Sequence, residues 1–405
     1  MSDLVRTAAP VIDWASDFDH TDPVWVDNPF PIWDDLRKQC PIAHSERYNG
    51  VYLPTRHEDI SAIAYDTDHF TSKSVIVSTG EIIADPPIGG APPITSDPPF
   101  HQHARRLLLP AFGPKVIEAL RPRVEELCDR LLDETEGKDI VDAAADYAQH
   151  IPPAVIAHML GLPIEDGQLF RDFIHNSIVA VDAPPEFRQE WFQRIDEYLD
   201  GHINDHRENP REDLISFLLE AEIFGNKLSH EHVRGTVVLL LIAGIDTTWS
   251  GIGASLYHLA STDADRNRLA SEPDLLPTAI EEFLRAYAPV TMARVVKEDV
   301  VISGTELKKD QYCLLPFPAA NRDPEQFVDA DQFIIDREEN RHSAFGLGIH
   351  RCLGSNLARL EMSVAVQKWM ERFPDFILED PTAVTWSAGQ VRGPRVLPVR
   401  ILQRA

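Results

Sequence analysis

The sequence of 405 residues contains little cysteine and no tract that would serve as a linker. Its four cysteines, Cys40, Cys128, Cys313 and Cys352, form no CxxC pair, which argues against a zinc site or a disulfide framework. No Gly/Ser-rich or low-complexity segment divides the chain, so we expect one domain over residues 1–405.

Long apolar runs and an excess of positive charge are missing as well. The longest strongly apolar stretch, residues 237–243, is too short to span a bilayer. Residues 1–19 carry four aspartates and lack the apolar segment of a signal peptide, so we expect a soluble, cytoplasmic protein without a membrane partner. A formal net charge of −27 would repel phosphate groups and argues against a nucleic-acid partner.

Helical periodicity dominates the remaining sequence. Apolar residues recur at helical spacing in residues 116–136, 190–207, 213–222, 230–260, 276–288 and 353–372. Strand-like pieces are short and lie at residues 50–53, 295–302, 312–316 and 396–401. This pattern predicts a mainly α fold of the α+β class. Residues 79–99, rich in proline and glycine, are expected to form a long ordered loop over a ligand site.

One cysteine lies in a glycine-rich segment near the C-terminus, FGLGIHRCLG at residues 345–354. Glycine allows tight turns and close approach of the backbone to a large planar ligand. Backbone amides in such a loop can donate hydrogen bonds to a sulfur anion and tune its electron density. A thiolate held in this way can bind a heme iron and favour cleavage of the O–O bond.

This segment resembles the cysteine-ligand loop of the cytochrome P450 family at every fixed position. The resemblance implies the cytochrome P450 fold, with long helices around a buried heme b. It makes Cys352 the thiolate ligand of the iron and places Phe345, Gly346 and Gly354 at the heme. It extends from about residue 28 to residue 401 and is nearest to heme domains of self-sufficient bacterial members, which carry a fused reductase. This chain shows no such module, so it either borrows electrons or is a heme domain cut from a longer protein.

A second segment, residues 97–106, opens with Asp97 and two prolines, which favours a helix capped by Asp97. His101 and Arg105 would then lie four positions apart on one helix face and could reach the same anion. The resemblance identifies that anion as the heme propionates, with His350 and Arg294 as further donors. A solvated basic helix start is the alternative.

A third segment lies in the middle of the long apolar helix predicted over residues 230–260. An acid and hydroxyls there are costly unless they are satisfied or used. Gly244 opens room against the helix backbone, and Thr247 can bond the carbonyl one turn back and loosen the helix. The resemblance places Ala243 and Gly244 at the heme, gives Thr247 the task of holding bound dioxygen, and makes Asp246 a proton relay. A polar patch with internal hydrogen bonds is the alternative.

Glu282 and Arg285 are three positions apart on a predicted helix and can pair on one face. The resemblance makes them the buried Glu–Arg pair of the family, with Arg337 as a third, structural member.

The partners follow from the same resemblance. Arg105, Arg106, Lys115, Arg351 and Arg359 are expected to form a basic face around the cysteine loop. Local positive charge steers an acidic partner, so we expect a ferredoxin-type electron donor there, reduced from NAD(P)H by its reductase. The alternative is that these arginines hold propionates or neighbouring carboxylates.

The substrate pocket is expected to be walled by residues 71–95, 170–192, 238–244, 290–292 and 390–391, with Val290, Thr291, Met292 and Val391 in contact with substrate. These segments lean apolar, which favours a small hydrophobic substrate, aromatic ones included. Arg392 could bind a carboxylate, although an arginine beside Gly393 in a strand is more often structural.

The sequence thus predicts a heme-thiolate monooxygenase that activates dioxygen with two electrons and hydroxylates or dealkylates its substrate. Two alternatives remain open. A peroxide-driven heme-thiolate enzyme would not need Asp246 and Thr247. A non-catalytic heme carrier or gas sensor would need neither a substrate pocket nor a docking face for a reductant.

Overall fold

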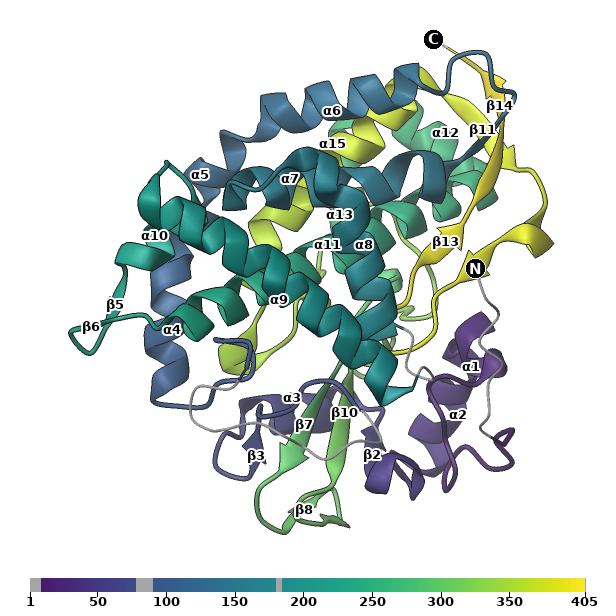
Figure 1. Ribbon diagram of the computed structural model, residues 1–405. Helices are drawn as coiled ribbons and strands as arrows, with labels where there is room; N and C mark the ends of the chain where they lie inside the picture. The colour runs from purple at the N-terminus through teal and green to yellow at the C-terminus, as the bar shows by residue number, and fades with distance from the viewer. Residues whose placement is uncertain (1–8, 78–89, 180–183, 405) are drawn as a thin grey trace.

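The computed structural model describes residues 9–77, 90–179 and 184–404, and this part of the chain is mainly helical, as predicted (Figure 1). The helices are α1 (Pro23–Asp27), α2 (Phe30–Gln39), α3 (His57–Tyr65), α4 (Phe100–Leu108), α5 (Pro114–Glu118), α6 (Arg121–Asp133), α7 (Ile151–Leu160), α8 (Gly167–Ile174), α9 (Pro185–Glu208), α10 (Leu214–Glu220), α11 (His230–Ser261), α12 (Asp263–Ser271), α13 (Leu276–Ala286), α14 (Phe317–Ala320) and α15 (Ser355–Arg372).

The sheets are small. One five-stranded sheet has the order β1-β2-β10-β7-β3, in which β10 runs parallel to β2 and the other pairs are antiparallel. A second sheet has the order β11-β14-β4, and three hairpins pair β5 with β6, β8 with β9 and β12 with β13. The strands are β1 (Ile42–Ser45), β2 (Val51–Pro54), β3 (Phe70–Thr71), β4 (Ile140–Asp142), β5 (Glu222–Ile223), β6 (Asn226–Lys227), β7 (Thr291–Val296), β8 (Val300–Ile302), β9 (Thr305–Leu307), β10 (Tyr312–Pro316), β11 (Asp375–Leu378), β12 (Thr385–Trp386), β13 (Pro394–Val396) and β14 (Pro398–Gln403).

Helix α11 lies at the centre of the helical layer and is packed against α7, α8, α9, α13 and α15. It begins where the Ser229 side chain accepts a hydrogen bond from the backbone N–H of His232. By length and composition α11 is the one helix among the described residues that could cross a membrane, and 67% of its most apolar window is buried inside the protein. Such burial is typical of a core helix.

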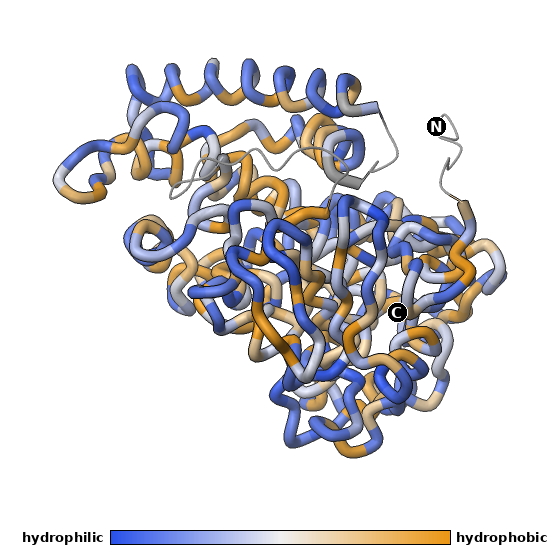
Figure 2. Tube along the Cα trace, turned by 90° about the horizontal axis from the view of Figure 1, so that it is seen from below, coloured by the Kyte–Doolittle hydropathy of each residue, from blue (hydrophilic) through white to orange (hydrophobic). Residues whose placement is uncertain are grey.

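Apolar side chains from many elements close around α11, and the largest buried cluster joins residues of α6, α7, α8, α13 and α15 to it. Figure 2 shows apolar and polar residues interleaved along the chain, as expected for amphipathic elements that each cover part of a core. A second buried cluster lies between α1, α2 and one face of the five-stranded sheet. The fold therefore surrounds α11 with helices and also brings it into contact with the C-terminal strands β11 and β13.

Several predicted elements are confirmed, and three are divided. Residues 116–136 form α5 and α6 instead of one helix, because Pro122 cannot continue a preceding helix and opens a new one. Residues 295–302 belong partly to β7 and partly to β8, which lie in different sheets. Residues 396–401 are divided between β13 and β14, where Pro398 starts the second strand.

Candidate active site

A cavity of about 1150 Å³ lies beside the middle of α11. Its walls come from α4, α11, the cysteine loop, β7 and the turn between β12 and β13, and they are mostly apolar. Nearly every residue that the sequence analysis assigned to the site lines this cavity: Ala243, Gly244, Thr247, His101, Arg105, Arg294, His350, Cys352, Phe345, Gly346, Gly354, Val290, Thr291, Met292 and Val391. Asp246 is the exception.

The cysteine loop needs its glycines for steric reasons. Gly348 has φ +69°, and a Cβ there would lie 2.2 Å from the carbonyl oxygen of Ala64, so no other residue fits. The loop closes on itself through a hydrogen bond of 2.7 Å from the N–H of Cys352 to the carbonyl oxygen of Phe345. Cys352 is exposed because it faces the cavity. The sequence therefore folds this segment so that Cys352 faces the mostly apolar cavity.

The surroundings of Cys352 act on its protonation in two directions. Burial among protein atoms raises the pKa of the thiol. A hydrogen bond from the N–H of Gly354 and the charges of Arg105, Arg351 and Arg359 lower it. A cation bound at the sulfur would lower the pKa of the thiol further, because the thiolate and not the thiol is the metal ligand.

Four basic side chains gather at one rim of the cavity. The rings of His101 and His350 lie 4.2 Å apart, and among the described residues neither ring nitrogen of His101 has a hydrogen-bond partner. Arg294 is only 5% exposed, and its guanidinium donates a hydrogen bond to the carbonyl oxygen of the adjacent Ala293. Burial and the neighbouring positive charges lower the pKa of His101 to about 4, and burial lowers the pKa of Arg294 to about 10. An unpartnered buried imidazole, beside a buried guanidinium that within the described chain bonds only a backbone carbonyl group, indicates a site for an anion.

This donor set fits a heme. The thiol of Cys352 would hold the iron, the apolar cavity would hold the ring, and the basic rim of His101, Arg105, Arg294 and His350 would hold the propionates.

One detail of the rim differs from the prediction. Asp97 does not cap α4 with its side chain, and Pro99 takes the cap position without a side-chain hydrogen bond. The carboxylate of Asp97 instead accepts hydrogen bonds from the hydroxyl of Thr71 and the N–H of Ser72. Ser72 Oγ in turn lies 2.8 Å from His350 Nε2. Asp97 therefore holds the end of β3 against the cysteine loop, a long-range contact that the local sequence pattern does not reveal.

The centre of α11 presents Thr247 to the cavity. Its hydroxyl donates a hydrogen bond of 2.8 Å to the carbonyl oxygen of Ala243, the back-bond that the sequence predicts. The expected loosening is absent, because α11 is a continuous α-helix over its whole length. Gly244 packs beside Ile156 and leaves no steric conflict for a small side chain.

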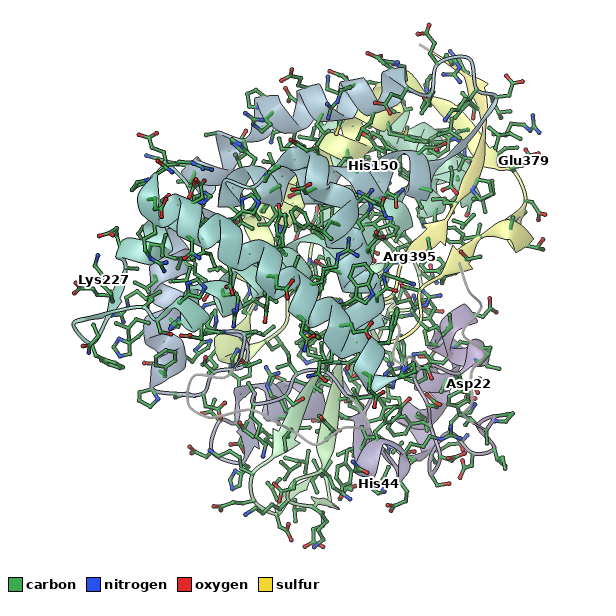
Figure 3. All side chains as sticks on the ribbon, in the orientation of Figure 1. Asp22, His44, His150, Lys227, Glu379 and Arg395 are labelled. Atoms are coloured by element: carbon green, nitrogen blue, oxygen red, sulfur yellow. The ribbon has the colours of Figure 1, made fainter. Side chains whose placement is uncertain are left out.

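Asp246 points away from the cavity and is buried against β13. Its Oδ1 accepts a hydrogen bond of 2.6 Å from Arg395, while its Oδ2 has no partner among the described residues (Arg395 is labelled in Figure 3). Arg395 also lies over the ring of Trp249 at 4.2 Å and donates to the hydroxyl of Ser250. Burial raises the pKa of Asp246, and the charge of Arg395 opposes this. The sequence analysis missed Arg395, although a buried helix acid by itself predicts a cation from another element.

The expected pocket walls are present with two changes. Of residues 170–192, Phe170 is fully buried, and among the described part of that segment Phe192 lines the cavity. Of the loop predicted over residues 79–99, residues 79–89 lie outside the described residues, and residues 90, 91 and 93–95 line the cavity, as expected. Arg392 is structural, because its guanidinium donates to the carbonyl oxygens of Val26 and Asp27 and lies over the ring of Trp386 at 4.0 Å.

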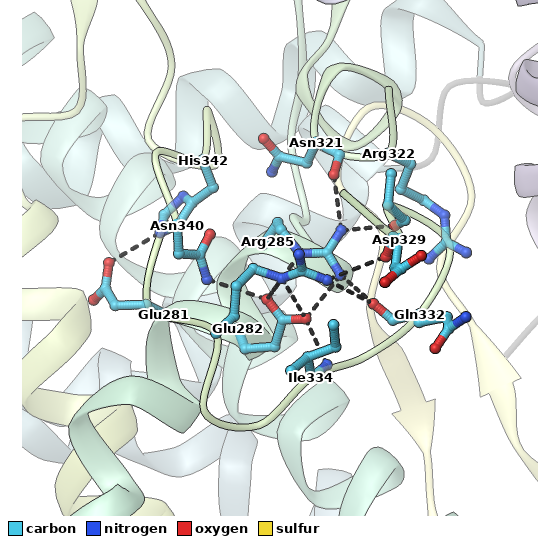
Figure 4. A network of polar contacts seen from close by, with 12 residues as sticks. Glu281, Glu282, Arg285, Asn321, Arg322, Asp329, Gln332, Ile334, Asn340 and His342 are labelled. Atoms are coloured by element: carbon cyan, nitrogen blue, oxygen red, sulfur yellow. Dashed lines mark hydrogen bonds and ion pairs between the residues drawn. The ribbon is translucent and has the colours of Figure 1, made fainter. Parts of the chain in front are cut away.

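A buried ionic network lies between α13 and the segment leading to the cysteine loop (Figure 4). Glu282 and Arg285 are both 0% exposed and are joined by two hydrogen bonds of 2.8 Å. Arg337 also donates to Glu282, and both arginines donate to backbone carbonyl groups, among them that of Gln332. The predicted triad therefore exists. It connects α13 to a segment that contains neither helix nor strand and whose backbone carbonyl groups accept hydrogen bonds from the two arginines.

The predicted basic face is only partly available. Arg359 is paired with Glu281 at 2.6 Å and lies over the ring of Phe345 at 4.4 Å, and Arg105 donates to the carbonyl oxygen of Arg351 while facing the cavity. Arg106, Lys115 and Arg351 are exposed.

Comparison with known proteins gives a consistent result. The sequence model of the family described as Cytochrome P450 matches residues 54–382. The polyketide biosynthesis cytochrome P450 PksS of Bacillus subtilis is 32% identical over 92% of this chain and 96% of its own length. The mycinamicin IV hydroxylase/epoxidase of Micromonospora griseorubida is 33% identical over 91% of this chain and 94% of its own. The crystal structure of CYP109E1 from Bacillus megaterium in complex with testosterone superposes with a TM-score of 0.85 at 31% identity, over 93% of this chain and 98% of that one.

Proposed function

The chain belongs to the cytochrome P450 family of monooxygenases, and on that premise we propose that it oxidises a bulky, mainly apolar substrate in the cavity beside α11. The observation that carries the proposal is the convergence of Cys352, the basic rim and Thr247 on one apolar cavity. We further propose that residues 1–405 act as a single heme domain.

Each group of residues in the cavity has its own proposed role. Cys352 binds the iron, and His101, Arg105, Arg294 and His350 hold the propionates by charge-assisted hydrogen bonds. When bound, the heme supplies the activation of dioxygen and the oxidation of the substrate. The apolar wall excludes water and holds the substrate in contact with Val290, Thr291, Met292 and Val391.

Protons are proposed to arrive from the α11 side. Thr247 can turn its hydroxyl from the carbonyl oxygen of Ala243 toward the cavity and donate there. Asp246 can carry a proton on Oδ2, the oxygen that Arg395 does not contact, and pass it along α11. A proton relay favours a reaction that uses dioxygen over one that uses peroxide, because peroxide already carries the protons that the relay would deliver.

The substrate is proposed from the cavity wall. Many of the side chains that line the cavity are aliphatic, among them Val238, Ile242, Val290 and Val391. The similar proteins include one named for polyketide biosynthesis and one crystallised with testosterone. We therefore propose a bulky aliphatic or polycyclic compound in place of a small aromatic one.

Electrons are proposed to come from NAD(P)H through a reductase and a small acidic ferredoxin. The exposed Arg106, Lys115 and Arg351 lie around the cysteine loop, where such a donor would be near the iron. Because this chemistry uses a cytosolic reductant, we propose that the protein acts in the cytoplasm.

A spectral titration of the ferric protein tests the proposal. Testosterone, a macrolide and myristic acid should move the Soret band toward the high-spin form, whereas benzoic acid and phenol should leave it in place. Each active compound is then incubated with NAD(P)H, reductase and ferredoxin, and separately with peroxide. Product only with peroxide would contradict the dioxygen route. Heme uptake without spectral response or product from any compound would favour a carrier or sensor.

A further inference from the structure

The side chain of Gln390 joins three distant segments of the cavity wall. Gln390 lies in the turn between β12 and β13 and itself lines the cavity. Its Oε1 accepts a hydrogen bond of 2.5 Å from the N–H of Val77. Its Nε2 donates to the carbonyl oxygens of Thr291 at 2.8 Å and Val75 at 3.1 Å.

These bonds match the chemistry of an amide side chain. One carbonyl oxygen meets one backbone donor, and one NH₂ group meets two backbone acceptors. The residues that follow β3 belong to no strand at Val75 and Val77, although both side chains are buried. Buried backbone groups require partners. The carbonyl oxygen of Val75 accepts from the N–H of Ala293 in β7 at 3.0 Å and also from Gln390, whereas the N–H of Val77 donates to Gln390.

The backbone of the same turn is fixed as well. The N–H of Thr291 donates to the carbonyl oxygen of Gln390 at 2.8 Å, and Val290 and Val391 form an isolated antiparallel bridge. The turn is therefore anchored to the start of β7 by its main chain. Among the described residues, the hydrogen bonds that link this turn to the segment after β3 are those of the Gln390 side chain.

All the joined segments face the same space. Val75 and Ile76 line the cavity after β3, Val290 to Met292 line it at β7, and Ala388 to Val391 supply the turn. Backbone bonds already join β7 to the segment after β3 and to the turn, so the amide sets the distance between the turn and the segment after β3. Apolar side chains of both would contact the substrate.

We propose that Gln390 is the positioning residue of the substrate wall, fixing the shape of the pocket and hence the choice of substrate and the carbon that is oxidised. The inference rests on the proposed function, since it assigns a role within that pocket. Gln390 acts through Val75, Thr291 and Val391 and needs no contact with the reacting atoms.

The test compares Gln390→Glu with wild type. Glutamate has the same shape but no NH₂, so an anionic oxygen would face the carbonyl groups of Val75 and Thr291. The matched control is Gln326→Glu, which adds the same charge at an exposed position. Gln390→Met, which keeps the length without charge, gives a second measurement if the glutamate variant folds poorly.

The probes are imidazole and a series of 1-alkylimidazoles of increasing chain length, whose binding to the heme iron is read from the Soret shift. Imidazole is too small to reach the wall, so its dissociation constant should be unchanged. Binding of the longest alkyl chains should weaken by about tenfold in the Gln390 variants, the equivalent of one or two lost hydrogen bonds. The ratio of products from any oxidised substrate should change in parallel.

Four results would overturn the inference. Equal affinities along the whole series in wild type and both Gln390 variants would show that the wall does not depend on the amide. Equal weakening of imidazole and of the long chains would assign Gln390 to general support of the heme pocket, as would failure of both variants to fold. A wild-type protein without a Soret band would instead overturn the proposed function, and this inference with it.

Discussion

Thr247 holds its hydroxyl proton on the carbonyl oxygen of Ala243, one turn earlier in α11. If that hydroxyl serves the reaction, Thr247→Ala should still bind heme and substrate. The yield of product per NAD(P)H should fall by roughly tenfold or more, and the remaining electrons should appear as peroxide. Both yields can be counted in one assay. Ser255→Ala is the matched control, because Ser255 makes the same type of bond on α11 outside the cavity. Unchanged coupling would remove Thr247 from the relay.

Glu361 shows how one buried group can set the pH dependence of stability. It is 1% exposed on α15, its Oε2 has no partner among the described residues, and burial raises its pKa well above the ordinary 4.5. The folded protein therefore binds a proton that the unfolded chain releases. The contribution of Glu361 to stability is fully present below about pH 4.5 and is lost as the pH rises toward the folded-state pKa.

Glu361→Gln removes this dependence, because glutamine cannot ionise. The melting temperature of the variant, relative to that of wild type, should increase as the pH rises from 5 to 8. Thermal unfolding at a series of pH values measures this difference. Melting curves that stay parallel over this range would show that Glu361 is ionised and paired in the folded protein.

At the level of elements, the network around Glu282 replaces secondary structure. Arg285 and Arg337 reach backbone carbonyl groups in a segment without strand or helix, and Glu282 neutralises both. Glu282→Gln should destabilise the protein by about 3–5 kcal/mol, because two buried guanidinium groups lose their counterion. Denaturant unfolding measures this loss, and the exposed Glu338→Gln serves as control. A loss below about 1 kcal/mol would mean that water reaches the network.

Sequence patterns predicted elements well where periodicity alone defines them, as in α11 and β10. They failed where proline acts locally. Pro122 and Pro398 divide predicted elements, and α7 was missed although Pro152 and Pro153 occupy its first turn, a position that tolerates proline. The side-chain partners of the site, such as Arg395 on Asp246, depend on tertiary packing and have no local signal.

On the scale of the whole molecule, the charge of −27 contrasts with the exposed Arg106, Lys115 and Arg351 near the cysteine loop. An acidic ferredoxin should reduce the protein fastest at low salt, with the rate falling by about tenfold or more as salt screens the attraction. Stopped-flow reduction at increasing ionic strength measures this. Arg106→Glu should slow reduction at low salt, whereas Arg194→Glu on α9 should not. A rate independent of ionic strength would place the docking face elsewhere.

The cavity itself could be predicted only through its motifs. Cys352, His101, Arg294 and Thr247 come from distant parts of the chain, and the resemblance to a family supplied their meeting point. Spacing in the sequence does not show which side of α11 faces the cavity. In the structure Thr247 lines the cavity, whereas Asp246 faces β13.

The pairing of Asp246 with Arg395 has a consequence for biosynthesis. During translation, α11 with its buried acid is made well before the strand that carries Arg395, and Cys352 also follows α11 in the chain. The growing polypeptide must therefore carry an apolar helix whose counter-charge does not yet exist. Closure of the interior around α11 therefore depends on residues close to the C-terminus and belongs late in folding.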